Sequence, residues 1–167
     1  VPIRMGVYSK DVNSRKLVSR RLRSAGLNEA KTYTLVSPEM SKLFKYDKKE
    51  NAILPNPMST DKSVIRTTIL PSLLNVYEYN KARKVNDILI YEIAKTYDKD
   101  YEETTKAAIL MKGNYLVNPA LNVNVKVDFF VLKGIIENLL DFLGYKNRYS
   151  FVKDENIDSM HPNMSAR

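Results

Sequence analysis

Few side chains in this sequence could carry acid–base, nucleophilic or metal chemistry. The chain has one histidine, His161, and no cysteine. A metal site needs clustered His, Cys, Asp or Glu at ligand spacing, and a nucleophilic triad needs a base beside its nucleophile. The carboxylate pairs at 102–103 and 154–155 lie in polar stretches that are typical of solvated loops. We therefore expect no catalytic and no metal-binding residue, and we interpret His161 as a hydrogen-bonded strand residue.

The glycines do not form a phosphate-binding pattern. Such loops need clustered glycines, because the backbone must approach the anion closely. The five glycines are instead scattered along the chain, at Gly6, Gly26, Gly113, Gly134 and Gly144. We expect no cofactor-binding residue in this chain.

Arg66 is the charged residue with the clearest predicted role. It stands between Ile65 and Thr67 in an apolar, β-branched run, so a strand there would bury its side chain. A buried arginine must find a carboxylate or carbonyl groups, because an unpaired buried charge is costly. We predict a structural ion pair with Glu92, and an ion pair with another subunit is the alternative.

A second charged feature is the basic side of a predicted first helix, largely opposite an apolar stripe that includes Leu17 and Leu22. The cations on that side are Arg15, Lys16, Arg20, Arg21 and Arg23. Three interpretations are open from these residues: a solvated face, contact with an acidic subunit surface, or contact with tRNA phosphates.

The composition is that of a single globular domain. Of the 167 residues, 44% are hydrophobic and 28% are charged, and no apolar run approaches the 18 residues of a membrane-spanning helix. The absence of cysteine and of a secretory signal fits a cytoplasmic protein.

The net charge of +8 favours a polyanionic partner, although solubility explains it as simply. The 11 tyrosines could form a base-stacking platform, but most lie within helix or strand patterns.

Hydrophobic periodicity, caps and turn residues predict alternating helices and strands. Helices are expected at about 13–25, 37–44, 68–83 and 129–143, with Asn13 or Ser14 capping the first. Strands are expected at 32–36, 87–97, 106–112 and 148–152, with another beginning in 160–167, and residues 113–126 are expected to be a loop. The irregular order and the hairpin signals predict an α+β fold with a mainly antiparallel sheet.

The most informative stretch is residues 54–74, which read LPNPMSTDKSVIRTTILPSLL. Pro55 and Pro57 fix φ and remove two amide donors, so they form an elbow rather than the middle of a strand or helix. Pro71 is tolerated only in the first turn of a helix, and an apolar face at helical spacing follows it.

This stretch resembles the L-x-N-P-x-S-x-x-x-S-x-L-R-x-x-L-L-P-G-L-L signature of the bacterial phenylalanyl-tRNA synthetase β-subunit family. Further motifs of that family follow in order: residues 79–83 resemble N-x-x-R, 91–95 resemble F-E-I-G-K, 127–134 resemble V-D-F-F-D-L-K-G, and 161–166 resemble H-P-G-R-S-A. This sequence departs from the motifs at Ile65, Ser72, Ala94, Asn163 and Met164. The resemblance covers roughly residues 10–167.

The resemblance implies a domain similar to a class II aminoacyl-tRNA synthetase core, with a mixed, mainly antiparallel sheet flanked by helices. It implies a lead-in at 1–10 and an incomplete core-like domain at 11–167, truncated at its C-terminus and belonging to a longer polypeptide. The arginine and acidic residues of the catalytic class II motif 2 are not found.

The first helix takes the place of the class II motif 1 helix, the usual subunit-interface element, so a subunit is the preferred partner of its basic side. The interface candidates are Arg15, Arg20, Arg23, Leu17 and Leu73.

The implied function is structural rather than catalytic. The domain would support assembly with the catalytic α-subunit, in an α2β2 enzyme that attaches phenylalanine to its tRNA. That complex would use ATP and magnesium, neither of which is expected to bind this chain, and tRNA would be reached through the complex. No membrane partner is expected, and the isolated chain is expected to self-associate. The alternatives are a free-standing basic RNA-binding module on a decayed synthetase fold and, third, an enzyme with an unrecognised site.

Overall fold

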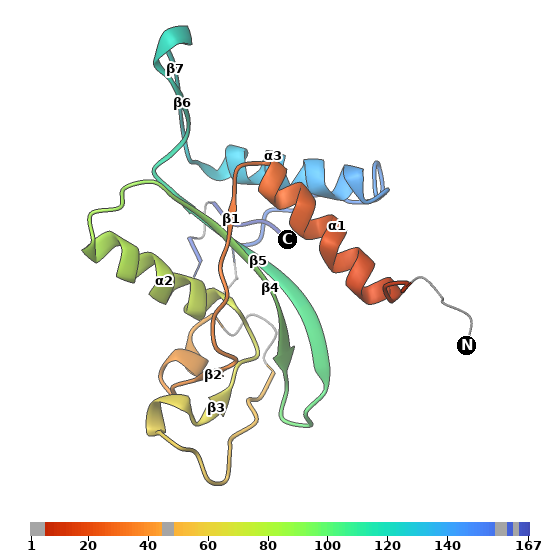
Figure 1. Cartoon of the computed structure of the whole chain (residues 1–167), viewed down its shortest axis with the longest axis vertical. Coiled ribbons are helices and arrows are strands. Elements are labelled where there is room, and N and C mark those ends of the chain that lie inside the picture. Colours follow the sequence, from red (N-terminus) through yellow and green to blue (C-terminus); the bar gives the residue numbers. More distant parts are fainter. Residues whose placement is uncertain (1–5, 45–48, 156–159, 162–163) are drawn as a thin grey trace.

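The computed structural model describes residues 6–44, 49–155, 160–161 and 164–167. Within those residues the α-helices are α1 (Lys10–Ser24), α2 (Leu70–Ala82) and α3 (Phe129–Phe142). The strands are β1 (Asn28–Glu29), β2 (Leu35–Val36), β3 (Val64–Ile65), β4 (Ile88–Tyr97), β5 (Glu103–Lys112), β6 (Asn114–Asn118) and β7 (Val123–Lys126). Short 3-10 helices occur at η1 (Met40–Lys42), η2 (Thr60–Lys62) and η3 (Pro119–Leu121), and Figure 1 shows the arrangement.

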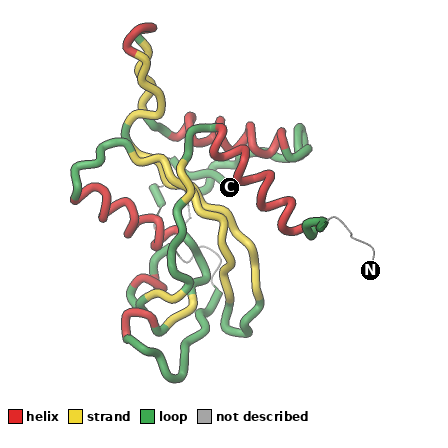
Figure 2. The backbone as a smooth tube through the Cα atoms, in the orientation of Figure 1, coloured by secondary structure: helices red, strands yellow, loops and turns green. Residues whose placement is uncertain are grey.

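A long hairpin of β4 and β5 forms the centre of the fold (Figure 2). The two strands pair antiparallel from Ile88 opposite Lys112 to Tyr97 opposite Glu103. Strand β1 adds to β4 in parallel, while β2 pairs with β3 and β6 pairs with β7, both antiparallel. The predicted α+β class with a mainly antiparallel sheet is therefore confirmed.

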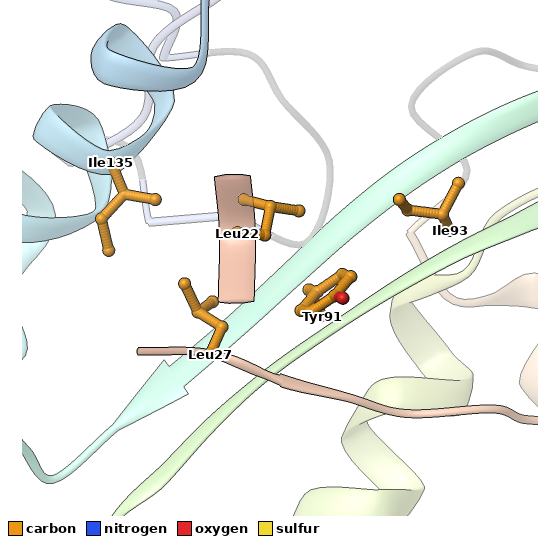
Figure 3. Packing of buried hydrophobic residues seen from close by; sticks show 5 residues of the cluster. All are labelled: Leu22, Leu27, Tyr91, Ile93 and Ile135. Atoms are coloured by element: carbon orange, nitrogen blue, oxygen red, sulfur yellow. The ribbon is translucent and has the colours of Figure 1, made fainter. Parts of the chain in front are cut away.

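The two faces of β4 serve different purposes, because successive side chains of a strand point to opposite sides. On one face, Tyr91 and Ile93 pack with Leu22 of α1 and Ile135 of α3, together with Leu27 (Figure 3). Tyr91 and Leu22 are completely buried. On the other face Glu92 binds Arg66. Helix α2 lies against β4 and β5.

The helix ends follow from local chemistry. Ser9 caps α1 by accepting a hydrogen bond from the Val12 amide, so the predicted caps Asn13 and Ser14 are wrong and the helix begins earlier. Asp128 caps α3 as the sequence predicts, accepting from the Val131 amide at 2.7 Å. Pro71 lies in the first turn of α2, where its missing N–H is not needed.

Several predicted elements differ from the structure. The predicted loop at 113–126 is the β6–β7 hairpin, and the predicted helix at 37–44 contains only the 3-10 turn η1. The predicted strand at 32–36 is reduced to β2, and β1 was not predicted. Among the described residues, the predicted strands at 148–152 and 160–167 are not regular strands: Val152 and Arg167 exchange two backbone hydrogen bonds at 2.8 Å, beside an isolated bridge between Lys153 and Ala166. In the described part of the chain, no helix is long and apolar enough to cross a membrane.

Candidate functional site

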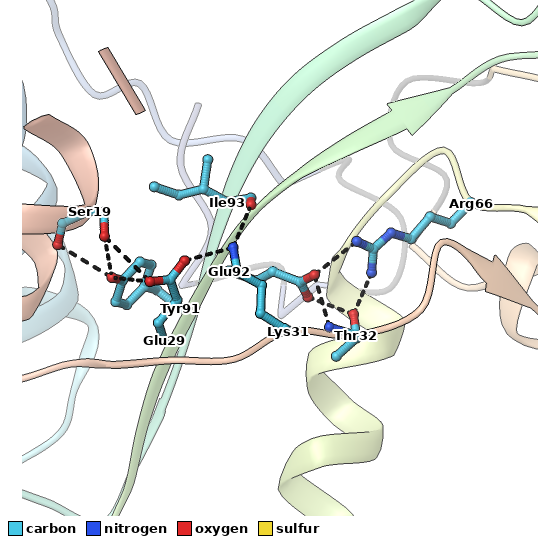
Figure 4. A network of polar contacts seen from close by, with 8 residues as sticks. All are labelled: Ser19, Glu29, Lys31, Thr32, Arg66, Tyr91, Glu92 and Ile93. Carbon is cyan, nitrogen blue, oxygen red and sulfur yellow. Dashed lines mark hydrogen bonds and ion pairs between the residues drawn. The ribbon is translucent and has the colours of Figure 1, made fainter. Parts of the chain in front are cut away.

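The structure brings Arg66 and Glu92 together inside the protein. Arg66 leaves the end of β3 and Glu92 lies in the middle of β4, and their side chains are only 2% and 1% exposed. Arg66 Nη2 donates to Glu92 Oε1 at 2.9 Å (Figure 4). This is the pair that the sequence predicts on the ground that a buried arginine needs a carboxylate.

Two hydroxyl groups complete the network around this ion pair. Arg66 Nη1 donates to Thr32 Oγ1 at 2.5 Å and to Ser72 Oγ at 3.1 Å. Thr32 in turn donates to Glu92 twice, from its backbone N–H at 3.1 Å and from its hydroxyl at 2.6 Å. The guanidinium fork is therefore divided between Glu92 and the hydroxyls, and the network ties together β3, β4, the segment after β1 and the start of α2.

The network lies beside a cavity of about 580 Å³, which Thr32 and Ser72 both line. The wall of the cavity also carries charged and aromatic side chains: Lys31, Tyr33, Glu39, Asp61, Lys62 and Tyr79. These charges are of both signs, so the cavity has no single electrostatic preference. Sequence reasoning missed both hydroxyls. Thr32 is 34 positions from Arg66, and although Ser72 is only six positions away, the sequence does not say that the start of α2 turns its hydroxyl towards Arg66.

A second polar cluster lies on the other face of β4 (Figure 4). The Tyr91 hydroxyl is 2.8 Å from Ser19 Oγ and donates to Glu29 Oε2 at 3.4 Å. Lys31 forms an ion pair with Glu29 at 2.7 Å. The Lys31 ammonium that donates to Glu29 holds the pKa of the Glu29 carboxyl below its ordinary value of 4.5. This cluster fastens α1 to β1 and β4.

The basic residues of α1 divide into two groups. Arg15 is half-buried and pairs with Asp11 at 3.1 Å, and Arg21 stacks over the Phe142 ring at 5.4 Å. Lys16, Arg20 and Arg23 are exposed, and we call them the basic surface of α1. Within the described part of the chain no carboxylate forms an ion pair with Arg20 or Arg23, and Lys16 lies over the exposed Tyr8 ring at 3.3 Å.

The two apolar interface candidates lie in different environments. Leu17 is 41% exposed on α1, beside the basic surface. Leu73 of α2 is completely buried within the chain itself, so the expectation that it lies on a contact surface is wrong. Helical spacing predicts an apolar face but does not say that the chain's own sheet covers it.

The described part of the chain places His161 at the surface. His161 is exposed, and its carbonyl accepts hydrogen bonds from the Met164 amide and the Ser165 hydroxyl. Within the same residues, His, Cys, Asp and Glu do not gather in a group of three or more that could hold a metal ion. The most deeply buried polar network in the described part of the chain is that of Arg66 and Glu92, in which Arg66 Nε has no hydrogen-bond partner.

Residues 1–167 match the family described as the phenylalanyl tRNA synthetase beta chain CLM domain. The chain belongs to this family. A relative named phenylalanine–tRNA ligase beta subunit, from Shouchella clausii (strain KSM-K16), is 35% identical over 168 residues that cover 96% of this chain and 21% of the relative. The protein of the same name from Bacillus subtilis (strain 168) is 34% identical over 157 residues, which cover 91% of this chain and 19% of that protein. The chain thus spans about a fifth of the length of these β-subunit relatives.

Solved structures show the same fold at low sequence identity. Two structures of pyrrolysyl tRNA synthetase from Desulfitobacterium hafniense match this family member with TM-scores of 0.63 and 0.60, each at 14% identity. The matches cover 87% and 86% of this chain, and 51% and 47% of those chains. The predicted fold, similar to a class II synthetase core, is confirmed by this likeness.

Proposed function

We propose that this β-subunit domain is a structural, catalytically silent part of a phenylalanine–tRNA ligase that supports assembly with a catalytic α-subunit. The observation that carries the proposal is the basic surface of α1. Lys16, Arg20 and Arg23 project outward from a helix that is fastened by its inner side to β1, β4 and α3. An ordered row of exposed cations beside a half-exposed leucine suits an acidic protein surface.

Catalytic silence is supported by the pairing of the buried charges of Arg66 and Glu92, which leaves neither charge facing a substrate. Arg66 and Glu92 neutralise each other, and their remaining partners are the Thr32 backbone N–H and the Thr32 and Ser72 hydroxyls of the same domain. We therefore place the ATP and magnesium that the ligase reaction needs in the catalytic subunit. The tRNA would contact the complex rather than this domain alone.

Charge reversal on the basic surface tests the assembly role. In the complete β-subunit, Arg20→Glu combined with Arg23→Glu should weaken binding of the α-subunit by roughly tenfold or more, because like charges now face each other. Lys146→Glu is the matched control, since Lys146 is an exposed cation that follows α3. Titration calorimetry at two salt concentrations measures both the affinity and its electrostatic share.

The alternative function, a free-standing RNA-binding module, gives a different result. It predicts that the chain binds tRNA with an affinity that falls steeply as salt rises, and that it forms no complex with the α-subunit. That outcome would overturn the assembly role. The net charge of +8 is the observation that keeps this alternative worth testing.

A further inference from the structure

The β6–β7 hairpin, Asn114–Lys126, projects from the body of the domain as an arm (Figure 1). Residues 113–125 contain no Asp, Glu, Lys, Arg or His, in a chain of which 28% of the residues are charged. The arm exposes large apolar side chains, which are unusual in a loop that contacts only solvent. Leu116, Val117 and Leu121 are 50%, 53% and 71% exposed.

The tip of the arm has a defined conformation. The Asn118 side chain accepts a hydrogen bond from the Leu121 amide at 3.3 Å, which caps the 3-10 turn η3. Pro119 fixes φ at the start of that turn, and Asn122 ends it in the left-handed conformation with φ of 50°. Leu121 is therefore presented at a definite position rather than on a formless loop.

The base of the arm is held firmly against the rest of the domain. The Asp87 carboxylate accepts hydrogen bonds from the Asn114 amide at 2.7 Å and from its side chain at 3.1 Å. Gly113 has φ of +92°, and a Cβ there would come within 2.5 Å of the Asn86 carbonyl oxygen, so only glycine fits. The Tyr115 hydroxyl donates to the Ala25 carbonyl at 3.0 Å, which fixes the arm relative to the end of α1.

A hollow of about 420 Å³ with a mixed polar and apolar lining lies where the arm meets the two helices. It is lined by Leu116 and Val125 of the arm, by Phe130 of α3, which is 74% exposed, and by Arg21 and Ser24 at the end of α1. The apolar surface of the arm is therefore continuous with the end of the helix that carries the basic surface. The arm therefore adjoins the C-terminal end of α1, next in sequence to Arg23 of the basic surface.

We propose that the arm docks on an uncharged, apolar surface of the α-subunit, next to the acidic surface that receives α1. This inference rests on the proposed function. A nucleic acid is a poor occupant, because the arm offers its phosphates a single cation, Lys126 at its base, and none between residues 113 and 125. A second copy that covered both the arm and the basic surface of α1 with the same face is disfavoured as well, because it would bring its own Lys16, Arg20 and Arg23 towards the same cations. Exposed leucines on a rigid support suit a hydrophobic groove of a protein partner.

Aspartate substitutions at the exposed positions test the proposal in the complete β-subunit. Leu121→Asp and Leu116→Asp should each weaken α-subunit binding by roughly tenfold or more, because a charge would be buried in an apolar contact. The matched control is Met58→Asp, at a fully exposed apolar residue that precedes η2. Thermal unfolding should show that the arm variants fold as stably as the control.

The dependence on salt separates the two surfaces. Raising NaCl from about 0.1 to 0.5 M should leave the effect of Leu121→Asp in place, whereas it should shrink the effect of the double charge reversal at Arg20 and Arg23. If the arm variants bind the α-subunit as the wild type does while the charge reversal still weakens binding, the arm proposal is overturned and the proposed function stands. If the wild-type β-subunit forms no complex with the α-subunit, the proposed function itself is overturned. If the arm variants change only self-association, the occupant is a second copy and the proposal is wrong.

Discussion

Arg66 Nη2 lies 2.9 Å from Glu92 Oε1, and both side chains are almost completely withdrawn from solvent. The two residues are 26 positions apart in sequence and join the end of β3 to the centre of β4. A buried pair of this kind is costly to break, because the partner left behind keeps its charge without compensation.

Arg66→Ala should lower the free energy of unfolding by about 3–5 kcal/mol, for this reason. Arg66→Lys should rescue only part of the loss, because one ammonium group cannot reach Glu92, Thr32 and Ser72 with the geometry of the divided guanidinium fork. Urea unfolding measures both values. Lys153→Ala is the matched control, since its pair with Glu155 is exposed and should change stability by less than about 1 kcal/mol. A value for Arg66→Ala within about 0.5 kcal/mol of wild type would show that the pair does not stabilise the core.

Stability should fall as the pH is lowered through the titration of Glu29. Lys31 lowers the folded-state pKa of Glu29 below 4.5, so the charged form is favoured by folding. The stabilisation is fully present above the unfolded-state pKa and is lost as the pH falls through the lower folded-state pKa. The thermal unfolding temperature, measured between pH 6 and about pH 3, should show this loss. In the Glu29→Gln variant the unfolding temperature should depend less on pH, because this carboxyl no longer titrates. A profile that Glu29→Gln leaves unchanged would show that the pair is not formed in solution.

The chain by itself should not activate phenylalanine. Its buried charges are committed to the Arg66–Glu92 network, and we place the ATP site in the α-subunit. ATP–pyrophosphate exchange with phenylalanine and no α-subunit should therefore stay at background. Exchange that follows the purified chain through its chromatographic peak would overturn the assignment as catalytically silent.

The isolated chain should self-associate at high concentration. In the described part of the chain β5 pairs only with β4, and among those residues no strand pairs with the other edge of this ten-residue strand, which another copy could use. An apolar cavity of about 430 Å³ lies beside that edge, lined by residues such as Ala107, Ile109 and Ile136. Leu17 is exposed and could join such a contact, whereas Leu73 could not. Light scattering over a concentration series measures the association, and a strict monomer at roughly 100 µM would contradict the prediction.

Local sequence signals determined the elements that form the body of the fold. Apolar spacing, the cap Asp128 and the first-turn proline Pro71 predict α3 and α2 to within a few residues, and the run after Asp87 predicts β4. The pairing of Arg66 with Glu92 could be predicted as well, because an arginine in a buried strand needs a counter-charge wherever the chain provides one.

Only the tertiary structure decided which surfaces are free and which hydroxyls complete the network. Leu17 and Leu73 both belong to helical apolar patterns, yet the fold exposes one and buries the other, because burial depends on which elements pack against each helix. Thr32 binds Arg66 across 34 positions of sequence, and Ser72, although only six positions from Arg66, reaches it because the chain turns from β3 into α2 between them. The arm was predicted as a loop, since its asparagines and Pro119 signal turns, whereas its strands form because each supplies the other's hydrogen-bond partners. Strand pairing of that kind is a property of two segments together, and neither segment encodes it alone.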